Sequence, residues 1–178
     1  MEIDDVQKGL ISCLEELIEK DQFLLVHDVS ERAISHRLGV YLTQYFIRFD
    51  VDCEYNSNIE ADNGRKYIVF LKEQAEKLGL LRIKEVDEEL IYRAVFPDII
   101  VHKRGKNGST NNTLIVEIKK TSSKIKNDYD LEKLKAYTSS DDENNLKYFI
   151  GAFVYIEAGN DKNGYTVEWY RDGIEYKT

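Results

Sequence analysis

The chain has 178 residues, of which 33% are charged, and its formal net charge is −8 at pH 7. This length fits one domain with a full core, and no low-complexity linker divides it, so we expect a single domain over residues 1–178. Cys13 and Cys53 lack the spacing of a disulfide framework or a zinc site and are predicted to be small core residues. The acidic start and the lack of an apolar run of ~20 residues argue against a signal peptide and a membrane partner, so we expect a cytoplasmic protein.

Two amphipathic helices are predicted in the first part of the chain. Apolar residues recur every three or four positions between Ile3 and Ile18, which indicates a helix packed on the core. Ser30 is a suitable N-cap for a second helix over residues 31–46, whose apolar side chains form one stripe. Glu31 falls on that inward stripe at the helix N-terminus, where it either belongs to a functional site or complements the helix dipole.

The rest of the sequence favours strands separated by helices. Helices are predicted over residues 67–79, whose first four residues (YIVF) also fit a strand, and over 130–140. Strands are predicted in VDCEY, PDIIV, TLIVEI, YFIGAFVYIEAG and YTVEWYRDG. The predicted order, α, α, β, α, β, β, α, β, β, indicates an α/β fold with a central mixed sheet flanked by helices.

Two carboxylates interrupt the strands of the predicted hairpin. Asp98 and Glu117 each stand in an otherwise apolar run, where an unpaired charge is costly. A register that pairs His102 with Thr113 places both carboxylates opposite each other on one face, with Cβ atoms ~5 Å apart, where they repel. A divalent cation between them removes the repulsion, and oxygen ligands of this kind suit Mg²⁺ or Mn²⁺. Lys119 would lie beside that metal, on the face of Glu117.

The residues Pro97-Asp98 and Glu117-Ile118-Lys119 resemble the motif of the PD-(D/E)XK nuclease superfamily. The hairpin sequences are most similar to small stand-alone bacterial members of that superfamily. The similarity covers about residues 30–156, from a helix with an acid, through a hairpin that carries the motif, to a further helix and strand. It implies a restriction-endonuclease-like core.

The resemblance also implies a role for each matching residue. Asp98, Glu117 and the backbone carbonyl of Ile118 would bind Mg²⁺ or Mn²⁺. Lys119 would orient or help activate the attacking water, and Glu31 would complete the catalytic site directly or through water. These roles agree with the chemistry, because phosphodiester hydrolysis needs an activated nucleophile and positive charge near the developing oxyanion.

Residues 102–135 hold nine lysines and arginines against four acids, a basic segment in an acidic chain. This segment either contacts phosphate or is a solvated surface. Lys133 and Tyr137, one helical turn apart, resemble the QxxxY motif of exonuclease-like members with Lys in place of Gln, while Tyr137 also fits an ordinary core aromatic. The residues expected to contact nucleic acid are Lys120, Lys124, Lys126, Lys133 and Tyr137.

We predict a Mg²⁺-dependent deoxyribonuclease that hydrolyses DNA phosphodiester bonds, of the kind that serves in phage defence. The alternative is a non-catalytic nucleic-acid-binding or assembly subunit of a larger complex, in which the acidic N-terminal helix docks a partner. Intact Glu31, Asp98, Glu117 and Lys119 favour the enzyme. The sequence leaves open RNA as a substrate, endonuclease or exonuclease mode, and action as a homodimer or within a defence or repair complex.

Overall fold

The computed structural model describes residues 2–58, 64–82, 85, 87–124, 127–141, 143–144, 146–159 and 164–177. Among these residues, three helices come first in the chain, and the strands follow with two further helices between them. The helices are α1 (Ile3–Lys20), α2 (Gln22–Val26), α3 (Glu31–Tyr45), α4 (Lys72–Lys77) and α5 (Asp128–Thr138). The strands are β1 (Asp50–Cys53), β2 (Tyr67–Leu71), β3 (Leu90–Ala94), β4 (Ile99–His102), β5 (Leu114–Lys120), β6 (Ile150–Ile156), β7 (Tyr165–Arg171) and β8 (Ile174–Tyr176).

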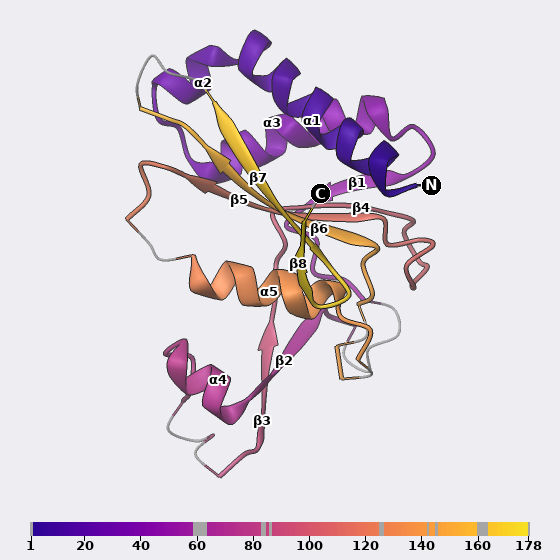
Figure 1. The fold of residues 1–178 in the computed structure, drawn as a ribbon, viewed down its shortest axis with the longest axis vertical. Coiled ribbons are helices and arrows are strands. Elements are labelled where there is room, and N and C mark those ends of the chain that lie inside the picture. Colours follow the sequence, from indigo (N-terminus) through magenta and orange to yellow (C-terminus); the bar gives the residue numbers. More distant parts are fainter. Residues whose placement is uncertain are drawn as a thin grey trace.

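A six-stranded sheet forms the middle layer, with the strand order β1-β4-β5-β6-β7-β8 (Figure 1). Strands β5 and β6 run parallel, and the other neighbours in this sheet are antiparallel. A parallel pair needs a crossover connection, and α5 lies in the connection from β5 to β6. The predicted mixed α/β architecture with flanking helices is therefore confirmed.

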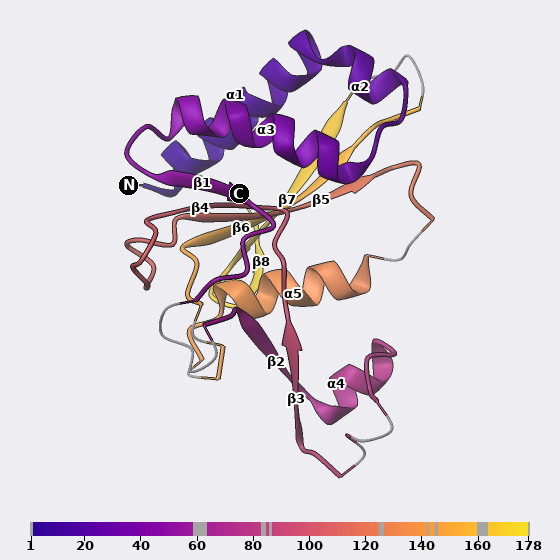
Figure 2. The ribbon, with the colours of Figure 1, turned by 180° about the vertical axis from the view of Figure 1, so that it is seen from behind.

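The two faces of the sheet are covered by different helices, as Figures 1 and 2 show. Helices α1 and α3 cover one face, where they meet Ile99, Val101, Leu114, Val116 and Ile118. Helix α5 covers the other face and packs its Leu134 and Tyr137 against Ile100 and Ile115. Because β4 and β5 are buried on both faces, their sequences are nearly continuous apolar runs.

The first part of the chain folds as its sequence predicts. The buried side chains of α1 recur every three or four residues, and Ser30 caps α3 by accepting a hydrogen bond from the Ala33 backbone N–H at 3.2 Å. Cys13 is buried and Cys53 is half-buried, and both are free thiols. No helix in the described part of the chain is long and apolar enough to cross a membrane.

Residues 67–79 differ from the predicted single helix. Residues 67–71 form β2, and only Lys72–Lys77 form a helix, which ends before Gly79 at a φ of +67°. The strand is favoured because β2 pairs with β3 in a two-stranded arm beyond α5, and this partner was not predicted (Figure 1). Thus the strand alternative for YIVF is confirmed, and the helix prediction was wrong there. Helix α2 and strand β8 were also not predicted.

Candidate functional site

Asp98 and Glu117 lie on the same face of neighbouring strands. The ladder between β4 and β5 pairs Ile99 with Val116, and its continuation by one residue brings Asp98 opposite Glu117. This is the register predicted from the sequence. Because strand side chains alternate, both carboxylates face α5 rather than α3.

Asp98 is held against the backbone of β5. Its Oδ2 accepts a hydrogen bond of 2.7 Å from the backbone N–H of Ile118. Burial raises the pKa of Asp98 to about 6, against the lowering effect of this hydrogen bond and of Lys133, and the nearby Asp130 and Glu31 carboxylates raise it further. Asp98 is therefore a carboxylate whose charge the protein does not fully compensate.

Glu117 is almost completely buried, with 3% of its surface exposed, and only one of its oxygens is partnered. Oε2 accepts a hydrogen bond of 2.8 Å from Lys133 Nζ. Oε1 has no hydrogen bond of good geometry within the described residues, and neither has the buried hydroxyl of Tyr137. Burial raises the pKa of Tyr137, and this hydroxyl nevertheless lies near enough to Glu117 for the carboxylate to raise that pKa further. Burial, helped by the Asp98 and Asp130 charges, raises the pKa of Glu117 to about 8 although Lys133 opposes this shift.

Helix α5 supplies two charged residues to the site. Asp130, in its first turn, lies with Oδ1 2.8 Å from Lys133 Nζ and with Oδ2 3.5 Å from Lys119 Nζ. Burial alone lowers the pKa of Lys133, but the Glu117 and Asp130 carboxylates outweigh that effect and raise it. Asp130 was not predicted as a site residue, although its position three residues before Lys133 on a predicted helix indicates a pair.

Glu31 approaches the same strand from the other helical layer. Its Oε1 accepts a hydrogen bond of 3.0 Å from the backbone N–H of Lys120, and it lies close enough to Asp98 to raise the pKa of that carboxyl. The prediction that Glu31 points inward is confirmed. The structure thus brings together Glu31, Asp98, Glu117 and Lys119 around β5.

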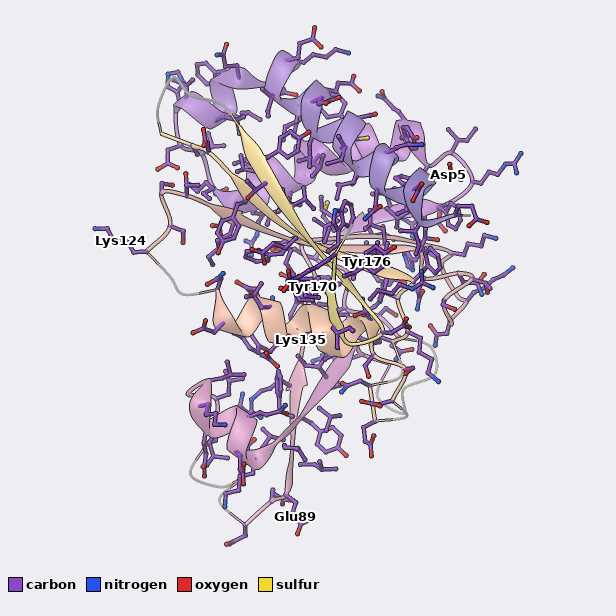
Figure 3. All side chains as sticks on the ribbon, in the orientation of Figure 1. Asp5, Glu89, Lys124, Lys135, Tyr170 and Tyr176 are labelled. Carbon is purple, nitrogen blue, oxygen red and sulfur yellow. The ribbon has the colours of Figure 1, made fainter. Side chains whose placement is uncertain are left out.

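The residues expected to contact nucleic acid have different surroundings. Lys120 Nζ lies 2.7 Å from both Asp28 Oδ1 and the Val29 carbonyl oxygen, and therefore ties the end of β5 to the segment before α3. Lys124 is exposed and projects away from the body of the protein (Figure 3). Lys126 lies outside the described residues. The contacts with nucleic acid stay predictions.

Lys133 and Tyr137 face the interior. Lys133 is 9% exposed, and Tyr137 is fully buried in the core on the α5 side, as expected for the alternative of a core aromatic. The basic segment as a whole is also less free than its sequence indicates. Among its described bases, five pair with carboxylates of this chain: Arg104, Lys119, Lys120, Lys133 and Lys135.

The candidate site fits a small divalent cation with few protein ligands. In the part of the chain that the structure describes, no three His, Cys, Asp or Glu side chains are grouped so that they alone hold a metal. Two carboxylates and the backbone carbonyl of Ile118 are available, which suits Mg²⁺ because this ion keeps several waters. The unpartnered Glu117 Oε1 agrees with such a ligand, since a buried carboxylate oxygen is costly to leave without a partner.

Three surface cavities, of about 540, 590 and 580 Å³, lie elsewhere. The first lies between β2, the end of α5 and the turn from β7 to β8, and the third lies between α1 and the strands β7 and β8. The second includes Lys135 and Tyr170, which Figure 3 labels. Asp98, Glu117 and Lys119 line none of these three cavities.

Comparisons with protein families, with curated proteins and with solved structures find no match to this chain.

Proposed function

We propose that this protein is a metal-dependent nuclease that hydrolyses DNA phosphodiester bonds at the Asp98–Glu117 site. The observation that carries the proposal is the placement of two carboxylates at opposing positions of β4 and β5, on one face, with a buried Glu117 oxygen left without a described partner. Carboxylates that repel each other at such positions are explained by a cation that both of them bind.

The order of elements supports a restriction-endonuclease-like core. Helix α3 brings Glu31, the β4–β5 hairpin brings Asp98 and Glu117, and α5 leads to β6, which runs parallel to β5. This is the arrangement that the resemblance to PD-(D/E)XK nucleases implies. Strands β2 and β3 with helix α4 stand between β1 and β4 in sequence and form the arm beyond α5.

In the proposed reaction, Asp98, Glu117 and the Ile118 carbonyl would hold Mg²⁺ or Mn²⁺. This ion would supply an activated water and neutralise charge on the phosphate. Lys119, on the face of Glu117, orients the attacking water and offsets the charge that develops on the phosphate oxygens. Asp130 positions the Lys119 ammonium, which lies 3.5 Å from its Oδ2. Glu31 holds the end of β5 through the Lys120 backbone and faces the site from α3.

A second function, a non-catalytic assembly or nucleic-acid-binding subunit, is favoured by one observation. The Lys133 ammonium already lies 2.8 Å from Glu117 Oε2, so an ion pair within the protein accounts for part of the Glu117 charge. In that alternative the cluster serves only to attach α5 to the sheet.

The test is incubation of the purified protein with supercoiled plasmid, linear duplex DNA, single-stranded DNA and RNA, each with Mg²⁺, Mn²⁺ or EDTA. We expect cleavage of DNA with either metal and none with EDTA. The matched control is Asp98→Asn, which removes one proposed ligand and is expected to leave the DNA intact. Folded protein that binds DNA but cuts none of these substrates would favour the subunit alternative, and cleavage of RNA alone would replace the proposed substrate.

A further inference from the structure

Lys133 is a buried cation shared by two carboxylates. Its ammonium lies 2.8 Å from Glu117 Oε2 and 2.8 Å from Asp130 Oδ1, and its Nζ lies 5.3 Å from the centre of the Tyr129 ring. With 9% of its surface exposed, Lys133 has left most of its hydration shell. Two carboxylates replace the water that this lysine gives up, which offsets the cost of burying its charge.

Glu117 Oε2 accepts a hydrogen bond from this ammonium, so a divalent cation bound at Oε1 would share one carboxylate group with Lys133. A metal bound to Glu117 would lie a few ångströms from Lys133 Nζ, and like charges at that distance repel strongly in a poorly hydrated site. The second partner, Asp130, lies on the same helix as Lys133 and offers the ammonium a place that does not involve Glu117. The ammonium therefore has two arrangements, one that bridges both carboxylates and one on Asp130 alone.

We propose that Lys133 is a built-in competitor of the metal, which holds Glu117 in the metal-free protein and withdraws to Asp130 when Mg²⁺ or Mn²⁺ binds. This inference rests on the proposed function, because it assumes that Glu117 is a metal ligand. In the metal-free protein, Lys133 neutralises the buried Glu117 carboxylate. Because the metal must displace this ammonium, Lys133 lowers the affinity of the site for the metal. Lys133 is thus a positioning residue on α5, and its contact with Glu117 depends on whether the metal is bound.

The experiment measures Mn²⁺ binding by isothermal titration calorimetry, without DNA, for the wild type, Lys133→Gln and Lys133→Met. Glutamine at position 133 keeps a hydrogen-bond donor for Glu117 but carries no charge. We therefore expect Lys133→Gln to remain folded even if Lys133→Met does not. We expect both folded variants to bind Mn²⁺ about tenfold more tightly or better, because the competing charge is gone. Their melting temperature without metal should fall, and the rise in melting temperature on adding Mn²⁺ should exceed that of the wild type.

Lys135→Gln is the matched control. Lys135 lies on the same helix, its side chain is 42% exposed, and it pairs with Glu132 rather than with a site carboxylate. This variant should bind Mn²⁺ like the wild type. Equal or weaker binding by Lys133→Gln, with binding by the wild type intact, would overturn the competitor role and leave the nuclease proposal standing. Lack of Mn²⁺ binding by every variant and the wild type would overturn the metal site itself.

Discussion

Two clusters of charged side chains lie at opposite ends of β4, and their charges are balanced differently. At the far end, His102 Nε2 lies 2.9 Å from Asp52 Oδ2, and Arg104 pairs with both Asp52 and Asp50. Burial lowers the pKa of His102, so the two carboxylates at this end are balanced by Arg104 and by the buried Lys66 ammonium, which interacts electrostatically with Asp52. This is the arrangement of a structural ion-pair network.

The other cluster carries an excess of negative charge. Among the described residues near Asp98, the carboxylates of Glu31, Asp98, Glu117 and Asp130 face only two site lysines, Lys119 and Lys133. Burial of charge alone therefore does not mark a functional site, because both ends of β4 bury charge. The difference is the uncompensated carboxylate charge, together with the oxygen of Glu117 that lacks a described partner.

The largest expected effect separates the two clusters by activity. Asp98→Asn and Glu117→Gln should each reduce Mg²⁺-dependent plasmid cleavage by at least about a hundredfold, because each removes a proposed metal ligand. His102→Gln, at the balanced end, should retain cleavage and lower the melting temperature instead. Gel assays of plasmid cleavage and thermal melts of the same protein samples make the comparison.

The stability of these variants sharpens the result. Burial raises the pKa of Asp98 to about 6, so Asp98 is mostly ionised at neutral pH, and its charge there lowers the stability of the fold relative to the unfolded chain. Asp98→Asn should therefore melt at or slightly above the wild-type temperature without metal. Carboxylate variants that melt much earlier than the wild type and still cut DNA would show that both clusters are structural.

The next effect compares one buried lysine from each end. Lys119→Met should abolish cleavage, leave Mn²⁺ binding in place, and lower the free energy of unfolding without metal by about 1 kcal/mol, because Asp130 loses a partner. Lys66 is 4% exposed and donates to the Ser57 carbonyl oxygen, and Lys66→Met should keep full cleavage. Cleavage assays and calorimetry with both variants check this, and equal loss of activity in both would remove the distinction between the clusters.

The smallest effect is a pH dependence at the balanced end. Burial lowers the pKa of Lys66 to about 8, so the folded protein binds fewer protons at this lysine than the unfolded chain, whose lysines titrate near ~10.4. The charged form therefore destabilises the fold below pH 8, and stability is regained as the pH rises through this window. The free energy of unfolding of the wild type, relative to Lys66→Met, should increase between pH 7.5 and pH 9.5. The upper pH lies about one unit below the pKa of lysine in the unfolded chain.

Urea denaturation of both proteins at these two pH values measures the difference, and tyrosines that titrate in the same range cancel in it. A constant difference between wild type and variant would show that Lys66 keeps an ordinary pKa and that its burial has no electrostatic cost.

Short-range patterns in the sequence determined most of the elements and the central pair of the site. The periodicity of α1, the Ser30 cap and the inward position of Glu31 depend on residues within a few turns of each other. The opposition of Asp98 and Glu117 follows from the pairing of two adjacent strands across one loop. Few backbone conformations fit such local patterns, so the residues themselves indicate the secondary structure and the direction of each side chain.

Only the tertiary structure decided which charges meet. The contacts of Lys133 with Glu117, and of Lys120 with Asp28, join residues 16 and 92 positions apart, and they depend on how α5 and the segment before α3 pack on β5. The same packing neutralises much of the basic segment of residues 102–135. The pairing of β2 with β3 makes YIVF a strand, where its sequence also fits a helix. These contacts are chosen by the burial of whole elements against one another, which no local pattern in the sequence contains.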